Sequence, residues 1–225
     1  MSTNYSFWDA EFTDDAPPVG EMHVAAASVS DVQEFARRYH YSGHASNQSW
    51  RYGLWHGLTL WGVAGFNLPT RETCESVFGE GHHDRVAHLS RLALADHALP
   101  NSESFLISHS LRLLSRDLPH LWAVITYADI LEGHLGYVYQ ATNAIYTGVG
   151  SSSHHRYVTQ DGKVRGDYEG SRFISAQEAK ERGWSVVKGL GKHRYVYILG
   201  TPRQKRERRA QLRLPSLPYP KSEAA

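Results

Sequence analysis

At 225 residues, 41% of them hydrophobic, the chain is long enough to bury a core as one domain with an appended tail. Its single cysteine, Cys74, excludes an intramolecular disulfide and favours a reducing compartment. No early apolar run resembles a signal peptide, and no run approaches the roughly 20 residues of a membrane span. The composition therefore predicts a soluble, cytoplasmic protein without a membrane partner.

Charge is distributed unevenly along the chain, although the formal net charge is only +1. The first thirty residues carry five acidic side chains and no lysine or arginine, whereas the part from Val186 onward carries ten basic residues and two acidic ones. A basic end indicates a polyanionic partner such as nucleic acid. A solvated helix face is the other interpretation of the same charges.

The first part of the chain predicts a loose acidic segment over residues 1–20 and then strands and helices in alternation. The expected elements are a strand at Met22–Ala27, a helix from a capping box at Ser30–Gln33 to about His40, a hairpin of Tyr52–Trp55 and Leu58–Phe66, a loop over 67–84 and a strand at Val86–Leu94. Arg91 lies in the middle of that last strand. Because an unpaired buried cation is costly, Arg91 either points to solvent or meets an anion.

A helix is predicted to begin after Pro100, with Asn101 or Ser102 as its N-cap and Ile107, Leu111 and Leu114 on its core face. Ser104 and Ser108 share another face near the helix N-terminus, where an anion is favoured. The alternative is that these serines only assist capping.

The segment 120–148 organises the rest. Leu121–Tyr127 is an apolar run typical of a buried central strand, and Asp129 marks the point where the chain leaves the sheet. From His134 to Gly148 the spacing predicts a helix that carries Tyr139 in a tyrosine stripe. Since ligands bind beyond the carboxyl ends of strands in open α/β sheets, Asp129 and Tyr139 mark a candidate site. The competing interpretation is that Asp129 caps a turn and the tyrosines pack.

The C-terminal part predicts short elements and a basic tail. These are a hairpin at Asp161-Gly162, a helix opened by Ser175, a strand at Arg194–Leu199, a basic helix at Arg203–Leu212 preceded by Pro202, and an extended Pro215–Pro220. The predicted division is a loose segment at 1–20, a catalytic domain at 21–200 and a basic helix with a Pro-rich tail at 201–225.

This order of elements resembles the acetyltransferase-like (GNAT) fold, an α/β (α+β) class with a central mixed sheet flanked by helices. In that fold a basic, glycine-rich loop after the fourth strand binds the pyrophosphate of acyl-CoA. The corresponding stretch here, Asp96–Ser102, contains neither glycine nor arginine. The departure argues against ordinary acyl-CoA binding.

An ordered set of segments resembles the Mom family of phage DNA-modification proteins over roughly His40 to Lys221. They are Tyr39–Gly43, Leu89–Leu92, Asn101–Phe105, Tyr127–Asp129, Gly133–Asn143, Lys192–Tyr197 and Leu217–Pro220. The resemblance implies transfer of a carbamoylmethyl group to the N6 amine of adenine in double-stranded DNA, which protects phage DNA from host restriction. The family's functional positions fall on His40, Tyr41, Arg91, Ser104, Asp129 and Tyr139.

The resemblance also brings cofactor and partner expectations. Mom-like proteins are associated with iron, for which His40 and Asp129 are the candidate ligands, with His44 or His134 as a third. The donor is expected to be acyl-CoA or an activated glycine such as glycyl-tRNA, which would make tRNA a second partner. The tail is expected to hold nucleic-acid phosphates through Arg203, Lys205, Arg206, Arg208, Arg209 and Arg213.

Two other functions fit parts of the sequence. One is a GNAT-like acyltransferase acting on a small-molecule or protein amine. The other is a nucleic-acid-binding protein without chemistry. A pocket shared by Asp129 and Tyr139 would favour an enzyme, and a filled apolar interior at that place would favour binding alone. Trp50, Trp55, Trp61 and Tyr41 are either stacking groups for an extruded base or, more simply, core aromatics.

Overall fold

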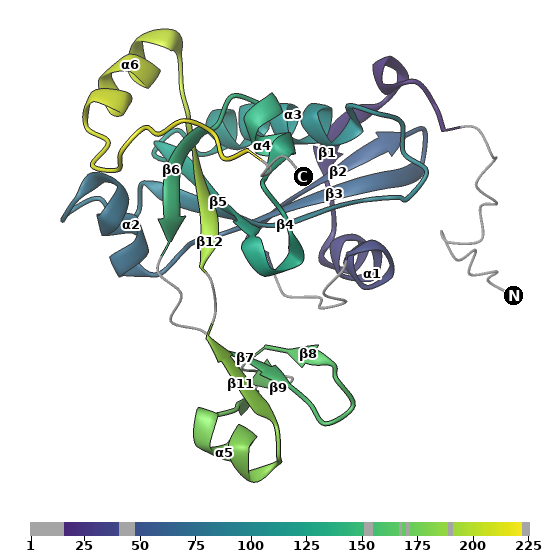
Figure 1. The fold of residues 1–225 in the computed structure, drawn as a ribbon. Helices are drawn as coiled ribbons and strands as arrows, with labels where there is room; N and C mark the ends of the chain where they lie inside the picture. Colours follow the sequence, from purple (N-terminus) through teal and green to yellow (C-terminus); the bar gives the residue numbers. More distant parts are fainter. Residues whose placement is uncertain are drawn as a thin grey trace, which may run out of the picture.

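The computed structural model describes residues 16–40, 48–150, 155–166, 168–169, 172–188 and 191–221. Seven strands form one mixed sheet in the order β1-β2-β3-β4-β5-β12-β6 (Figure 1). Their bounds are β1 His23–Ala26, β2 Trp50–His56, β3 Thr59–Asn67, β4 Val86–Leu94, β5 Ala123–Asp129, β6 Ile145–Gly150 and β12 Lys192–Ile198. The predicted fold class, a central mixed sheet flanked by helices, is confirmed.

The sheet contains a gap between the neighbouring strands β4 and β5. β4 and β5 are parallel and pair only from Val86 opposite Ala123 to His88 opposite Ile125, whereas the other neighbours in this sheet are antiparallel. Beyond that point each strand keeps only its other neighbour, and the Thr126 hydroxyl donates to the Leu89 carbonyl across the widening gap at 3.3 Å. The two strands therefore part toward the carboxyl end of β5.

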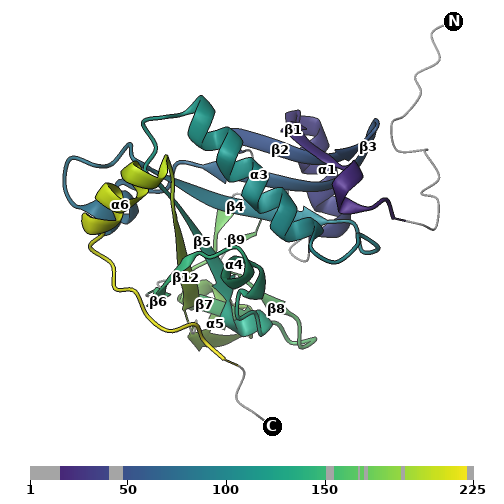
Figure 2. The same ribbon diagram turned by 90° about the horizontal axis from the view of Figure 1, so that it is seen from above.

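Helices cover both faces of the sheet (Figures 1 and 2). They are α1 Val29–Tyr39, α2 Arg71–Phe78, α3 Ser102–Asp117, the short α4 Tyr137–Ala141 and α6 Pro202–Ala210, with 3-10 turns η1 Val19–Glu21 and η2 Ile130–Glu132. α3 lies across one face (Figure 2) and buries Leu106, Ile107 and Leu114. α1 packs on the opposite face through Val32 and Phe35.

A small subdomain with two short sheets, one of three strands and one of two, is inserted between β6 and β12; residues 155–188 are called the insert below. It contains β7 His155–Val158, β8 Val164–Arg165, β9 Tyr168–Glu169, β10 Arg172–Phe173, α5 Ala176–Glu181 and β11 Ser185–Lys188. Its own core consists of Tyr157, Ile174 and Ala179, with Trp184 and Val186 packed against them. In Figure 1 the insert lies beyond the end of the main sheet at which β12 begins.

Three local predictions were wrong. The N-terminal cap of α1 is Ser28, whose hydroxyl accepts from the Asp31 N–H at 3.1 Å, and not Ser30. The predicted loop at 67–84 contains α2, which Thr70 caps and which buries Cys74, Val77 and Phe78. These apolar residues have helical spacing, but the run is short and its polar positions hide the pattern.

The helix predicted from His134 to Gly148 is also wrong. Only Tyr137–Ala141 is α-helical, and Ile145 already begins β6. Gly136 and Asn143 have left-handed φ values of 73° and 61°, which bound the helix at both ends. Pairing with β12 then takes the following residues into the sheet, so tertiary pairing overrides the helical spacing.

Other local predictions are confirmed. β4 has the predicted bounds, the Asp161-Gly162 turn joins β7 to β8, and Pro202 opens α6 after the Thr201 cap. Trp61 is buried in the main core, and the partly buried Trp50 and Trp55 pack against that core, which favours packing over base stacking. Among the described residues, no helix combines the length and apolar character that crossing a membrane requires.

Candidate active site

A cavity of about 1120 Å³ opens where β4 and β5 part. Five of the six residues predicted as catalytic line it, and they come from five separate elements or element ends. They are His40, Arg91, Ser104, Asp129 and Tyr139. The sixth, Tyr41, lies outside the described residues. The structure therefore brings together every predicted catalytic residue that it describes, while their roles remain proposals.

A bulge in β4 aims Arg91. Gly65 of β3 pairs with Arg91 but Phe66 pairs with Leu89, so Ser90 is the extra residue. The Ser90 hydroxyl donates to the Gly65 carbonyl at 3.3 Å and accepts from the Asn67 amide at 3.1 Å, which holds the bulge in place. The mid-strand arginine is thus turned into the cavity and away from bulk solvent.

His40 meets Arg91 there. It is the C-cap residue of α1, and Arg91 Nη1 lies 3.1 Å from its Nδ1 and 3.3 Å from its Nε2. Because a guanidinium only donates, the imidazole must be the acceptor. Burial, then the charge of Arg91 and that of His134, lowers the pKa of His40 to about 4. His40 is therefore neutral at pH 7.

Asp129, at the carboxyl end of β5, is held by two cations. Its side chain is only 4% exposed, and its Oδ2 lies 2.6 Å from Arg156 Nη2 and 3.2 Å from Lys192 Nζ. Lys192 is the residue directly opposite on β12. A buried carboxylate needs such partners. Asp129 therefore presents an anchored negative charge at the cavity wall.

Tyr139 stands on α4 and faces β12. Its ring centroid lies 5.4 Å from that of Tyr195, whose hydroxyl donates to the Leu135 carbonyl. Gly136, with φ 73°, begins the helix; a Cβ at that residue would lie 2.6 Å from the Tyr195 ring and 3.0 Å from the Tyr139 ring. Only glycine fits this turn, so the backbone fixes where Tyr139 stands.

The N-terminus of α3 forms another part of the wall. Ser104 lines the cavity, whereas Ser108 lines a different hollow described below. The preceding loop suits a pyrophosphate poorly, because Pro100 has no N–H and the N–H groups of Ala98 and Ser102 already donate to Ala95 and Leu99. These three positions therefore offer no amide to the pyrophosphate of an acyl-CoA.

The expected iron site does not fit the described residues. The His40 ring faces a guanidinium and the Asp129 carboxylate faces two cations, and both neighbours repel a metal ion. Within the described part of the chain, no three His, Cys, Asp or Glu side chains gather as metal ligands. His134 lines the same cavity, and His44 lies outside the described residues.

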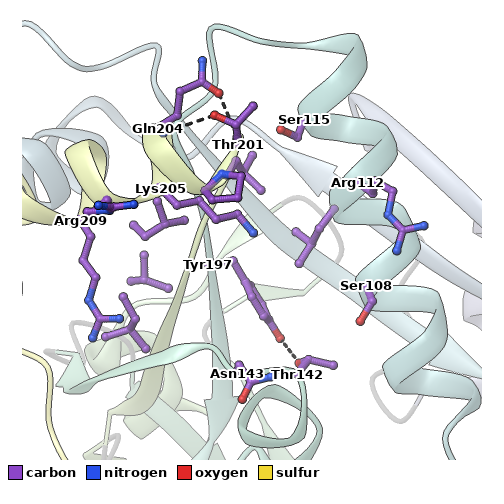
Figure 3. A pocket seen from close by; sticks show the side chains of 18 of the residues that line it. Ser108, Arg112, Ser115, Thr142, Asn143, Tyr197, Thr201, Gln204, Lys205 and Arg209 are labelled. Atoms are coloured by element: carbon purple, nitrogen blue, oxygen red, sulfur yellow. Dashed lines mark hydrogen bonds between the residues drawn. The ribbon is translucent and has the colours of Figure 1, made fainter.

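A second hollow, a groove of about 1000 Å³, runs between α3, the end of β12 and α6 (Figure 3). The Tyr197 hydroxyl lies 2.5 Å from the Thr142 hydroxyl at its floor. Its basic lining residues include three of the predicted nucleic-acid contacts, joined by Arg112 of α3. The three are Lys205, Arg206 and Arg209. No carboxylate lies within ion-pair distance of these four cations among the described residues, so the groove is an electropositive hollow.

Arg208 and Arg213, which were also predicted as phosphate contacts, do not line this groove. Arg208 is 9% exposed, donates to the carbonyls of Leu199, Leu121 and Pro119 at 2.8, 3.3 and 3.4 Å, and lies over the Trp122 ring. The Arg208 side chain therefore packs and hydrogen-bonds within the protein instead of facing solvent.

Arg213 is exposed but lies beyond the end of α6. Its guanidinium sits against Gly79 at the C-terminus of α2, and its N–H donates to the Val77 carbonyl at 2.9 Å. A cation there complements the helix dipole. Arg203 projects into solvent and pairs with Glu207 at 2.8 Å, so its charge is largely neutralised locally.

The sequence did not single out three residues that shape the cavity. Lys192 belongs to Lys192–Tyr197, one of the segments that resemble the Mom family, but the resemblance implied no role for it. His88 lines the cavity, and burial together with the charges of Lys192 and Arg91 lowers its pKa to about 4. Arg156 belongs to the part of the chain in which neither periodicity nor resemblance gave a signal, so only tertiary structure could reveal it.

Comparisons with known proteins agree on one family. The model of the Mom protein family matches residues 21–221. The chain is 28% identical over 211 residues to methylcarbamoylase mom of Escherichia phage Mu, which spans 89% of this chain and 84% of that protein.

Solved structures with a similar arrangement are N-acetyltransferases. The ribosomal-protein-S18-alanine N-acetyltransferase of Escherichia coli gives a TM-score of 0.47 at 9% identity, over 80% of this chain and 95% of that one. The spermidine/spermine N-acetyltransferase of Vibrio cholerae gives 0.45 at 9% identity, over 80% and 94%. Such scores are too low to transfer a substrate or a binding site.

Proposed function

Because the chain belongs to the Mom protein family, we propose that it transfers a carbamoylmethyl group to N6 of adenine in phage DNA and so protects that DNA from host restriction. The observation that carries the proposal is the convergence of His40, Arg91, Ser104, Asp129 and Tyr139 on one cavity. At about 1120 Å³, the cavity is large enough for a nucleobase together with a small donor group.

The acceptor must leave the double helix to react. An adenine inside a duplex is unreachable, so the enzyme extrudes the base or acts on unpaired DNA. Tyr137, which is exposed, and Tyr139 both line the cavity, so they offer the extruded base aromatic surface. Asp129 is then the acceptor for a hydrogen bond from the N6 amine, because its anchored carboxylate keeps a fixed direction.

The chemistry sets the tasks of the other residues. Adenine N6 is a weak nucleophile, because its lone pair is delocalised into the ring, so the cavity must hold the donor close and stabilise the oxygen that gains charge. Arg91 suits that oxygen: it is cationic, partly buried and held by the neutral His40. Ser104 adds a hydroxyl at the positive end of α3.

For the donor, we propose an activated glycine. A carbamoylmethyl group, CH2-CO-NH2, has the same atoms as a glycyl group, CO-CH2-NH2, joined through the other carbon. Glycyl transfer followed by rearrangement would supply every atom, whereas an acetyl group lacks the amide nitrogen. The loop at 96–102 further disfavours acyl-CoA, because the N–H groups of Ala98 and Ser102 already donate to backbone carbonyls and Pro100 has no N–H.

We assign binding of the DNA phosphates to the basic groove between α3, the end of β12 and α6. Its cations Lys205, Arg206 and Arg209 on α6 and Arg112 on α3 line the same groove as Thr142, the residue that ends α4, which is the helix that carries Tyr139. Phosphate contacts of this kind position a duplex without reading its sequence.

The decisive experiment is mass spectrometry of nucleosides from DNA of cells that express the chain or its Asp129→Asn variant. We expect a modified adenosine only with the unsubstituted chain. With glycine labelled at both carbons and the nitrogen, the adduct should carry all three labels. Unmodified adenine in both samples would contradict the reaction, and an adduct with labelled carbons and unlabelled nitrogen would contradict the donor alone.

A further inference from the structure

The Asp129 carboxylate is clamped from two sides of the sheet edge. Lys192 reaches it from the neighbouring strand β12, and Arg156 reaches it from β7 of the insert. The two contacts differ in stiffness. The Lys192 side chain is 51% exposed and ends in a flexible ammonium, whereas the Arg156 side chain is 22% exposed and ends in a planar fork. Arg156 is therefore the contact able to set a direction.

Arg156 also holds the turn that follows the strand. Its Nη2 lies 2.6 Å from Asp129, and its Nη1 lies 3.3 Å from Glu132 of η2. Both carboxylates belong to one short turn, which is closed by the His134 N–H donating to the Asp129 carbonyl and the Gly133 N–H donating to the Ile130 carbonyl, each at 3.0 Å. One guanidinium thus ties both ends of the turn that presents Asp129 to the cavity.

The position of Arg156 is set by the insert and not by the main sheet. β7 pairs with β11 and β8, and the next residue, Tyr157, is buried in the insert's own core, where its hydroxyl donates to the Ile174 carbonyl at 2.9 Å. A folded insert therefore delivers the guanidinium to one place, although none of the insert's described residues lines the cavity.

From these contacts we infer that Arg156 is a positioning residue for Asp129, and that the insert is part of the catalytic unit. The inference rests on the proposed function and extends it. Without the guanidinium, the Asp129 carboxylate loses its fixed direction and η2 loses its tie to the insert. The side chains that line the cavity are themselves not substituted. Misplacement of a reacting group by about 1 Å can cost about 100-fold in rate.

The test compares Arg156→Gln and Arg156→Lys with the matched control Arg172→Gln. Arg172 also lies in the insert and pairs with Glu178 at 2.9 Å, but it contacts neither Asp129 nor Glu132. In an adenine-modification assay with purified protein, Arg156→Gln should lower kcat by about 10- to 100-fold with little change in KM for DNA. Arg156→Lys should recover part of kcat, and Arg172→Gln should leave both constants unchanged.

A second readout does not depend on activity. Amide hydrogen exchange at Gly133 and His134 should become faster in Arg156→Gln and stay unchanged in Arg172→Gln, because only the first variant releases the turn. Unchanged kcat and exchange in Arg156→Gln would overturn the positioning role while the proposed function stands. Faster exchange in a protein whose unsubstituted form modifies no adenine would retain the structural role and reject the proposed function. A loss confined to KM, or an equal loss in Arg172→Gln, would also overturn the inference.

Discussion

Arg91 Nη1 lies 3.1 Å from Nδ1 of His40, and this contact joins the middle of β4 to the end of α1 in the wall of the cavity. Burial and then the charge of Arg91 keep the imidazole neutral, and the neutral imidazole accepts a hydrogen bond from the guanidinium.

Acidification should destabilise the protein through its cavity histidines. Burial lowers the pKa of both His40 and His88 to about 4 from the ordinary value of 6.5. The folded state then binds fewer protons than the unfolded chain between these values, so stability is full above pH 6.5 and falls as the pH drops toward 4. The limiting slope is about 1.4 kcal/mol per pH unit for each histidine.

Urea unfolding at several pH values between 4 and 7 measures this dependence. His88→Gln should flatten the curve, and the exposed His83→Gln should leave it as it is. Glu103, whose pKa is raised by burial, acts in the opposite direction, so the comparison between variants carries the test. Equal slopes for His88→Gln and the unsubstituted chain would contradict the prediction.

Neutralising the groove should weaken DNA binding and its dependence on salt. We expect a Lys205→Gln, Arg206→Gln, Arg209→Gln variant to lose about one unit of slope, in log Kd against log salt, for each phosphate contact removed. Arg203→Gln on the same helix is the control, since Glu207 already neutralises Arg203. Fluorescence anisotropy with labelled duplex DNA supplies both values, and an unchanged slope in the triple variant would return α6 to the role of a solvated face.

Arg208, in contrast, should matter for stability. Arg208→Met removes a donor shared by three backbone carbonyls in a buried place, and we expect the free energy of unfolding to fall by about 2–3 kcal/mol. The salt slope of DNA binding should stay unchanged. A variant that keeps its stability and loses a unit of salt slope would show that Arg208 contacts phosphate after all.

Gly136 offers a test of how Tyr139 is placed. Gly136→Ala should cost about 1–2 kcal/mol for the left-handed backbone, and the added Cβ also meets the Tyr195 and Tyr139 rings. Modification activity should fall as Tyr139 shifts. Gly81→Ala is the matched control, because Gly81 has φ 80° and open space around its Cβ position and lies outside the cavity lining, so it bears the backbone cost alone. Equal activity in the two variants would separate Tyr139 from the reaction.

Strands were the most predictable part of the fold. Val86–Leu94 could be read from its apolar run, and the hairpins from their turn residues, because both signals are local. The end of α4 and the start of β6 could not, since residues 142–148 keep helical spacing and only the partner strand β12 decides their conformation.

The candidate site divides in the same way. Asp129 at a strand exit and Ser104 at a helix N-terminus follow from local position, and Arg91 from the cost of a cation within a strand. Tyr139 follows from its place in a tyrosine stripe after the strand that ends at Asp129, whereas His40 needed the family resemblance. Arg156 and the buried role of Arg208 depend on contacts between residues far apart in the sequence, for which spacing and composition carry no signal.

The place of the insert in the chain has a consequence for how the sheet tolerates change. β6 and β12 are antiparallel neighbours, with Gly150 directly opposite Lys192, so the insert is topologically one long hairpin connection. The entropy of closing such a connection rises only by about 0.6 kcal/mol for each doubling of its length. Shortening or lengthening residues 151–191 should therefore leave the main sheet folded, and a shortened chain that lacks Arg156 would be a stable protein whose Asp129 carboxylate keeps Lys192 but has lost its planar partner.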